Sequence, residues 1–214
     1  MNREDRKERI AALHREQILK AAEVLFTEKG YAQTTIDDIA KNSDYSRRTI
    51  YAYFESKEDI LHHIIRDGLL KLKEEIEAAV YGEGTFPEQY RAVCAAMYRY
   101  QTECPHSADN VNRASPRETD LSGASGAVKD ILTLGTEINT ILAEFLTTGQ
   151  EKGAVRKSVV PQMAVYVLWS SITSFITLFQ TKGNFLCGAL GVSGEAFLEY
   201  GFKQIINSVL EERI

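Results

Sequence analysis

Residues 36–54 read IDDIAKNSDYSRRTIYAYF, and this stretch decides the fold of the N-terminal part of the chain. Thr35 stands three residues before Asp38, which is the spacing of a capping box with Asp in place of the usual Glu, so a helix is predicted to begin here. Asp44 follows the end of that helix, where a sharp turn needs a positive φ that glycine adopts most readily and Asp tolerates. Ser46 can then cap a second short helix that runs to the end of the stretch. The stretch therefore predicts two short helices joined by a tight turn.

The two helices must pack closely for this turn to close. Ala40 is a small residue in the first helix, where the second helix has to approach, and Tyr45 and Ile50 are the apolar side chains expected between them. This packing leaves one face of the second helix exposed. That face carries Arg47, Arg48, Thr49, Ala52 and Tyr53. The arrangement is a helix-turn-helix.

The exposed face carries side-chain types that read base edges. In the major groove, arginine pairs with guanine, threonine bonds several bases, and apolar groups contact the thymine methyl. Residues 46–54 include two arginines and no acid. A DNA-recognition helix is therefore predicted, with Arg48 as a guanine contact. The alternative is a helix-turn-helix that binds no DNA and presents solvated arginines.

Contacts with the phosphate backbone must come from local placement of charge. Residues 1–62 hold 11 Lys and Arg against 12 Asp and Glu, so the N-terminal part is not a basic domain. We expect phosphate contacts from Arg47, Lys57, Thr35 and the hydroxyl of Tyr51. The full predicted DNA-binding set is Thr35, Ser46, Arg47, Arg48, Thr49, Tyr51, Tyr53 and Lys57.

Outside this stretch the sequence also reads as helices. Apolar residues recur at three- and four-residue spacing, strand-like alternation is not sustained, and Gly and Pro fall between the periodic segments. The expected further helices cover residues 6–29, 56–80, 87–103, 127–152, 161–181 and 194–212, with a loop or broken short helices over 104–126. The predicted fold is all-α. A three-helix domain over residues 1–55 is joined by a fourth helix to a C-terminal domain of antiparallel helices over residues 56–214.

The composition excludes several classes of protein. The chain has 214 residues, a net charge of −5 and 44% hydrophobic residues, which is too apolar and too weakly charged for intrinsic disorder. The N-terminus is densely charged and lacks the apolar centre of an export signal. The most apolar run, residues 163–179, contains five Ser or Thr residues, whereas a membrane span needs roughly 18 uninterrupted apolar residues. A cytoplasmic protein without membrane contact is expected.

The sequence carries no pattern typical of an enzyme or a metal site. Cys94, Cys104 and Cys187 form no CxxC pair, and the adjacent His62 and His63 diverge by about 100° on a helix, so they cannot share one ion. The HExxH, GxSxG, P-loop and GxGxxG motifs are absent. We therefore expect no catalytic residue, no metal, no cofactor, and reduced thiols.

The run from Ile18 to Leu61 resembles the N-terminal domain of the TetR (tetracycline-repressor-like) family of bacterial transcriptional regulators. The matching pieces are ILKAAEVLFTEKGY, TTIDDIA and YSRRTIYAYFESKEDIL, about 45 of the 214 residues. The sequence departs from the family at three positions. Asp44 replaces the usual turn glycine, Arg48 stands where a small residue is common, and Tyr53 stands where histidine is common. Because the last two lie on the reading face, the family's base preference is not transferred.

The resemblance implies nine or so helices, a symmetric dimer and a small ligand held in the C-terminal domain, with the predicted contact residues at the DNA. A dimer reads two half-sites, so the operator is expected to be roughly palindromic. The wide apolar surfaces of the last two helices favour them as the dimer interface, and the alternative is a thicker monomer core. The predicted interface residues are Leu168, Ile172, Ile176, Phe179, Phe202, Ile205, Ile206 and Val209.

The ligand site follows from the mixture of aromatic bulk and isolated polar groups that small-molecule pockets have. The candidate lining is Tyr90, Cys94, Met97, Tyr98, Ile138, Ile141, Phe145, Trp169, Thr173 and Phe175. The expected function is sequence-specific repression, with an unidentified small-molecule effector that releases the operator by changing the tilt of the fourth helix. The alternative is a DNA-binding dimer, constitutive or regulated by a partner protein, whose C-terminal domain is only a dimerisation scaffold.

Overall fold

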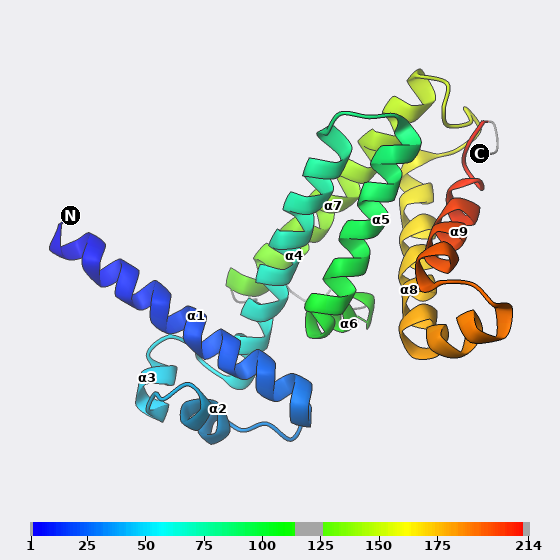
Figure 1. Ribbon diagram of the computed structural model, residues 1–214. Coiled ribbons are helices and arrows are strands. Elements are labelled where there is room, and N and C mark those ends of the chain that lie inside the picture. The colour runs from blue at the N-terminus through cyan, green and yellow to red at the C-terminus, as the bar shows by residue number, and fades with distance from the viewer. Residues whose placement is uncertain (1, 114–125, 212–214) are drawn as a thin grey trace. The chain divides into compact units, whose positions relative to one another are not determined.

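The computed structural model describes residues 2–113 and 126–211, and its named elements are all helices (Figure 1). The predicted all-α class is therefore confirmed. The helices are α1 Arg3–Lys29, α2 Ile36–Asn42, α3 Arg47–Tyr51, α4 Lys57–Tyr81, α5 Phe86–Glu103, α6 Pro105–Arg113, α7 Gly126–Glu151, α8 Pro161–Leu190 and α9 Gly194–Ile206.

The chain forms two compact units. Among the described residues, the N-terminal unit contains residues 2–68, 106–113 and 126–131, and the C-terminal unit contains residues 69–105 and 132–211. Helices α4 and α7 each supply residues to both units. The functional boundary that we place between residues 55 and 56 stays a prediction.

The N-terminal unit is organised around α1, beside which α2 and α3 lie (Figure 1). The long helix buries Ile18, Ala22 and Phe26, which recur at four-residue spacing and so form one stripe. Gly30 ends the helix with a φ of 85°, a backbone conformation that favours glycine at a helix C-terminus.

Local signals place the start of α2 and α3 as predicted. The Thr35 hydroxyl accepts a bond from the Asp38 N–H at 3.2 Å, and the Asp38 carboxylate accepts one from the Thr35 N–H at 2.8 Å, which completes the capping box. Asp44 has a φ of 57°, as the tight turn requires. The Ser46 hydroxyl accepts a bond from the Thr49 N–H at 3.1 Å and caps α3.

The packing between α2 and α3 depends on three buried side chains, Ile39, Ala40 and Ile50. Full burial of a side chain such as Ile50 contributes about 1.5–3 kcal/mol. Tyr45, expected in the same interface, is half-buried, and its N–H donates to the Ala40 carbonyl at 3.0 Å across the turn. Helix α3 ends at Tyr51, three residues earlier than predicted.

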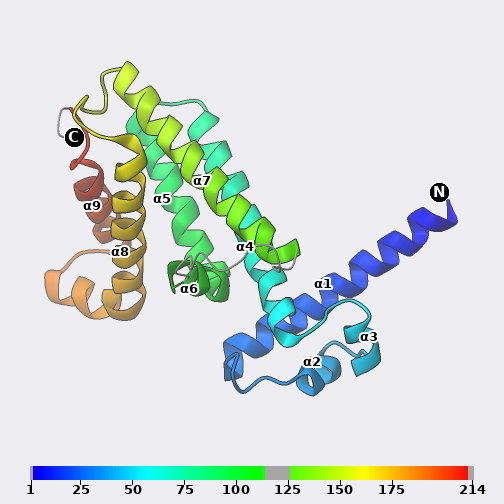
Figure 2. The ribbon, with the colours of Figure 1, turned by 180° about the vertical axis from the view of Figure 1, so that it is seen from behind.

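In the C-terminal unit, α8 packs against both α5 and α9 (Figure 2). The buried hydroxyl of Tyr90 on α5 donates to the Phe202 carbonyl on α9 at 3.1 Å. Gly201 allows the Phe175 ring to lie directly on the backbone of α9, because a Cβ at residue 201 would stand 2.0 Å from Cζ of that ring. These contacts fix α9 to the other two helices.

Helices α8 and α9 differ in length from the prediction, for local reasons. We expected α8 to end near residue 181, but it continues to Leu190. Gly183 does not end the helix, because the Phe179 ring of the preceding turn covers it and fills the space of a side chain. Helix α9 ends at Ile206 rather than at residue 212, because Leu210 instead forms an isolated antiparallel bridge with Val155.

Helix α8 is also the one described helix that is long and apolar enough to cross a membrane. Its most apolar 18-residue window has a mean hydropathy of 1.4, and 28% of that window is buried within the chain. The hydroxyls of Ser171, Thr173, Thr177 and Thr181 donate to carbonyls of their own helix one turn earlier, so these side chains add no unpaired donor. The expected absence of membrane contact stays a prediction.

Candidate DNA-binding and effector sites

The polar side chains of α3 face solvent. Arg47, Arg48 and Tyr51 are exposed, whereas Thr49 is half-buried, with its hydroxyl 2.8 Å from that of Ser46. Within the described part of the chain, Arg48 has no ion-pair partner. The helix therefore offers two guanidinium groups and one phenol to a ligand that approaches from solvent.

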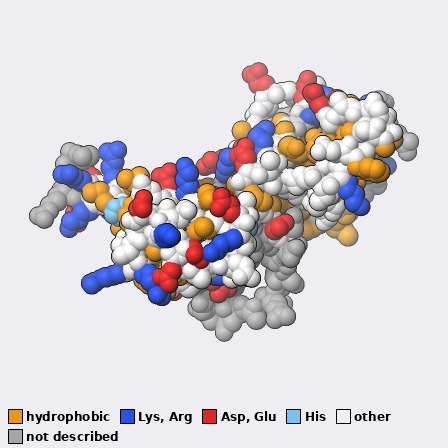
Figure 3. Space-filling model, turned by 60° about the horizontal axis from the view of Figure 1, so that its bottom comes forward, with side chains coloured by type: hydrophobic (Ala, Val, Ile, Leu, Met, Phe, Trp, Pro, Cys, Tyr) orange, Lys and Arg blue, Asp and Glu red, His pale blue; other side chains and the backbone are white. Residues whose placement is uncertain are grey.

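The charge on this face is mixed, as in Figure 3, where basic and acidic side chains are interspersed over the helix-turn-helix. The Arg47 Nε lies 3.2 Å from an oxygen of Asp37, and both side chains are mostly exposed. An exposed ion pair contributes about 0–1 kcal/mol, so a phosphate can displace Asp37 at little cost.

Tyr53 is held by α1. Its hydroxyl lies 3.0 Å from Nδ1 of His14, the two rings meet edge to face at 5.8 Å, and the guanidinium of Arg15 lies 5.7 Å from the tyrosine ring centre. The His14 ring also contacts Tyr45 at 4.9 Å. The prediction missed His14 and Arg15 as partners of the reading face, because they precede Tyr53 by 39 and 38 residues and no local pattern links them.

Lys57 points into the domain, not toward solvent. Its ammonium group donates to the carbonyls of Tyr31 and Thr34, each at 2.8 Å, and lies 4.3 Å from the centre of the Tyr31 ring. These bonds hold the connection between α1 and α2. The ammonium already serves two backbone acceptors, which gives Lys57 a structural role, and its phosphate contact stays a prediction.

Thr35 also serves the fold, through Asp38. The ammonium of Lys29, 2.7 Å away, and then the Thr35 hydroxyl hold the pKa of the Asp38 carboxyl far below its usual value. Asp38 is therefore ionised at neutral pH and keeps the N-terminus of α2 capped. The Thr35 side chain remains exposed, and its phosphate contact stays a prediction.

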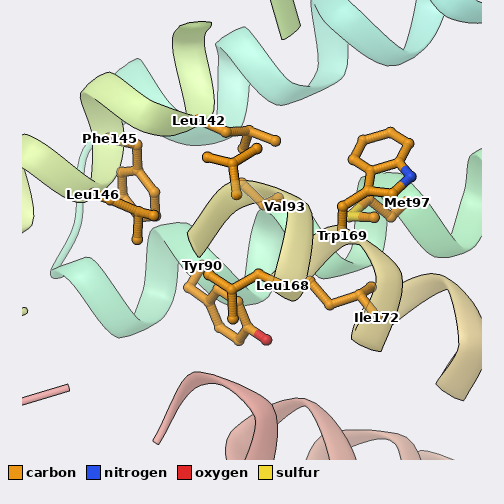
Figure 4. Close-up of a pocket in the computed structure, with 10 residues that line it drawn as sticks. Tyr90, Val93, Met97, Leu142, Phe145, Leu146, Leu168, Trp169 and Ile172 are labelled. Carbon is orange, nitrogen blue, oxygen red and sulfur yellow. The ribbon is translucent and has the colours of Figure 1, made fainter. Parts of the chain in front are cut away.

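The interior of the C-terminal unit contains a small apolar cavity of about 30 Å³ (Figure 4). Four of the predicted ligand residues line it, namely Tyr90, Met97, Phe145 and Trp169. The other lining residues are Val93, Leu142, Leu146, Val165, Leu168 and Ile172. The predicted residues outside the lining are Cys94, Tyr98, Ile138, Ile141, Thr173 and Phe175. The volume suits about one water molecule, whereas ligand pockets span about 300–1,000 Å³, so a ligand requires these side chains to move.

Cys94 lies beside this cavity, but its thiol is in the unreactive, protonated form. Burial raises the pKa of its thiol to about 12. Because the thiolate is the reactive form, this cysteine is inert in the folded protein at neutral pH. Within the described residues, no three His, Cys, Asp or Glu side chains come together as a metal site.

Most of the predicted dimer residues lie in the core of the single chain. Six are buried within the chain, each at most 9% exposed, and their place in a dimer interface stays a prediction: Leu168, Ile172, Ile176, Phe202, Ile206 and Val209. Phe179 and Ile205 are half-buried. The apolar side chains that α8 and α9 do expose are different ones, and the six most exposed are Met163, Tyr166, Val167, Phe185, Leu190 and Tyr200. The periodic pattern located the apolar helices but did not separate their inner faces from their outer faces.

Helix α3 is capped, follows a turn with a positive φ and carries arginines on its exposed face. These features define a helix-turn-helix DNA-binding protein. The sequence profile of the bacterial regulatory proteins of the tetR family matches residues 18–64, which span most of α1, all of α2 and α3, and the start of α4. Residues 18–64 therefore form a DNA-binding domain of the TetR family, and the chain is a transcriptional regulator.

Known relatives agree with this assignment. The fatty acid metabolism regulator protein of Bacillus subtilis (strain 168) is 25% identical over 168 residues, which cover 75% of this chain and 80% of that protein. The negative transcriptional regulator IcaR of the Staphylococcus aureus (strain Newman) biofilm operon icaADBC is 38% identical over 52 residues, or 24% of this chain and 28% of IcaR. The crystal structure of Bacillus subtilis FadR in complex with stearoyl-CoA has the same fold, with a TM-score of 0.67, 21% identity, and coverage of 89% of this chain and 97% of FadR.

Proposed function

We propose that this regulator is a cytoplasmic repressor, without catalytic activity, that binds a roughly palindromic operator as a homodimer and leaves it when a small effector enters the C-terminal unit. The observation that carries the proposal is α3 itself. Its capped start and the positive φ of Asp44 hold a short helix whose exposed face presents Arg47, Arg48 and Tyr51.

In this proposal, α3 enters the major groove. Arg48 reads guanine, since it is exposed and unpaired among the described residues, and Arg47 exchanges Asp37 for a phosphate. Tyr51 supplies a hydroxyl to the backbone, and Tyr53 keeps its place beside the helix through His14. A single helix reads only a few base pairs, so a second subunit is needed for useful specificity.

We assign the second subunit to the outer face of α8. Met163, Tyr166, Val167, Ser170 and Ser174 are all exposed and recur at three- and four-residue spacing, so they share one face of the helix. The apolar members supply area to bury, and the two serines let a partner helix approach closely. A second copy of this chain is the proposed occupant, because two-fold homodimers are the commonest assembly and TetR-family regulators act as dimers.

The effector is proposed to expand the cavity bounded by α5, α7 and α8. Its lining is apolar apart from the Tyr90 hydroxyl, which is bonded to Phe202, and the indole N–H of Trp169. It includes Met97, whose unbranched side chain adapts to irregular shapes. One relative regulates fatty acid metabolism, and FadR was crystallised with stearoyl-CoA, so long-chain acyl compounds are the first to test.

The effector is proposed to reach the DNA-binding helices through α4, which passes from one unit into the other. The start of α6 adds contacts inside the N-terminal unit. There, the Ser107 hydroxyl donates to the Ile65 carbonyl on α4 at 3.0 Å, and the His106 ring lies 3.1 Å from the Thr27 hydroxyl on α1. An effector shifts operator affinity only by its differential affinity for the two states, typically about 1–3 kcal/mol.

The test is selection of binders from a random double-stranded DNA pool at near-physiological salt. Recovery of a palindromic consensus is expected, and a pool that stays random, both alone and with cell extract, contradicts the proposal. Acyl compounds are then added to the complex with the selected site. No rise in melting temperature with any compound would favour the alternative, in which the C-terminal domain is only a dimerisation scaffold. Compounds that raise the melting temperature but leave operator affinity unchanged would contradict the proposed release of the operator by the effector.

A further inference from the structure

One buried polar atom of the C-terminal unit has no hydrogen-bond partner among the described residues. It is Oε1 of Gln101, on α5, whose residue is only 7% exposed. Buried polar groups in folded proteins are nearly always paired, because an unpaired one loses its bonds to water without replacement. Gln101 was not predicted as a ligand residue, since a glutamine in an amphipathic helix carries no sequence signal.

The orientation of the Gln101 amide follows from its one partner. Its Nε2 donates to the Thr173 carbonyl on α8 at 3.4 Å. A carbonyl can only accept, so the nitrogen must face Thr173 and the oxygen must face away from it. The unpaired atom is therefore an acceptor, and only a donor can satisfy it.

Gln101 lies one helical turn beyond the cavity. Met97 precedes it by four residues on α5, and Trp169 precedes its partner Thr173 by four residues on α8. Both Met97 and Trp169 line the cavity, and they lie together at one end of it (Figure 4). Residues four apart share a helix face. The pair Gln101 and Thr173 therefore continues the cavity wall past Met97 and Trp169.

We propose that Oε1 of Gln101 is the polar anchor of the effector site, and that the effector is a mainly apolar molecule with an N–H or O–H donor at one end. This inference rests on the proposed effector function. Movement of Met97 and Trp169 would join the cavity to Gln101. Carboxylate, ester and thioester groups only accept, so among long-chain acyl compounds this atom favours those that also carry an amide N–H or a hydroxyl.

The experiment compares indole with benzofuran, two molecules of nearly the same shape in which an N–H is replaced by an ether oxygen. Binding is measured by calorimetry on the full-length wild type, on Gln101→Leu and on Gln180→Leu. The last removes a glutamine of the same kind from an exposed position on α8. We expect indole to bind about tenfold or more tightly than benzofuran to the wild type and to Gln180→Leu, and the two probes to bind about equally to Gln101→Leu.

Three results would overturn the inference: equal affinity of the two probes for the wild type, full discrimination by Gln101→Leu, or no binding of either probe. Operator binding is measured on the same samples, so loss of the anchor is distinguished from failure of the proposed DNA-binding function. Gln101→Leu removes the unpaired oxygen together with the long Nε2 bond to the Thr173 carbonyl, which still accepts from the Thr177 hydroxyl at 2.9 Å. The variant should therefore melt close to the wild type. If it does not fold, Gln101→Met, which keeps the length of the side chain, takes its place with the same expected loss of discrimination.

Discussion

Replacement of Lys57 by methionine tests whether this lysine stabilises the fold or contacts a DNA phosphate. Methionine keeps the apolar stem but removes both ammonium bonds to the Tyr31 and Thr34 carbonyls. A hydrogen bond to a charged group contributes about 1.5–3 kcal/mol, so two such bonds contribute at least about 3 kcal/mol when buried. Screening by solvent at this half-buried position reduces the expected loss to about 2 kcal/mol. For a protein of this size that loss lowers the melting temperature by about 4–8 °C.

The same substitution should leave the salt dependence of operator binding unchanged. The logarithm of affinity falls with the logarithm of salt concentration by about 0.9 per neutralised phosphate, and Lys57 is not expected to neutralise one. Arg47→Ala removes a proposed phosphate contact from each subunit, so it should reduce the slope by about 2 per dimer. Its exposed ion pair with Asp37 predicts a change in unfolding free energy within about 0.5 kcal/mol.

The two variants are compared by urea unfolding at one protein concentration and by fluorescence anisotropy with the selected operator between about 50 and 200 mM salt. Lys152→Met, an exposed lysine of the C-terminal unit, is the matched control and should change neither quantity. The reasoning is refuted if Lys57→Met reduces the slope as Arg47→Ala does and leaves the unfolding free energy at the wild-type value.

Three further predictions concern single side chains. Gly201→Ala should destabilise the protein by about 1–3 kcal/mol, because its Cβ would stand 2.0 Å from the Phe175 ring. Gly135→Ala in α7, where a Cβ would have no atom within 4 Å, should instead stabilise the protein by up to about 1 kcal/mol. Urea unfolding would contradict this if both changes in unfolding free energy had the same sign. Asp44→Gly should raise the unfolding free energy by up to about 1 kcal/mol, since glycine adopts the φ of 57° without strain, and a loss of stability or of operator binding would count against the turn assignment. Cys94 should resist iodoacetamide at pH 8 until the protein is unfolded, because burial raises its pKa to about 12; mass spectrometry that finds it alkylated in the native protein would disprove this.

The helix-turn-helix could be predicted because its signals are local. A cap lies three residues from its partner, as with Thr35 and Asp38, and the turn at Asp44 needs one unusual φ that few residue types tolerate. Each of these constraints acts within one or two turns of helix, so a single sequence contains both partners in register. The helix pattern of the remaining chain was readable for the same reason.

The sequence did not reveal contacts between residues far apart in the chain. The charge of Lys57 was visible in the sequence, but its carbonyl acceptors, 23 and 26 residues earlier, were not. The unpaired oxygen of Gln101 could not be predicted either, because it is defined by the absence of a partner in the folded chain. The inner and outer faces of α8 could not be separated from the sequence, since a helix that is apolar around most of its circumference does not reveal which stripe a neighbouring helix covers.

The bond between the Tyr90 hydroxyl and the Phe202 carbonyl limits how this protein can evolve. Tyr90 is both part of the cavity wall and the tether of α9, so a substitution that makes room for a new molecule at that end also loosens a helix of the C-terminal unit. Met97 and Leu142 line the same cavity, and neither carries a polar atom that tethers another helix. New ligand preferences should therefore arise first by changes at Met97 and Leu142, while Tyr90 is retained.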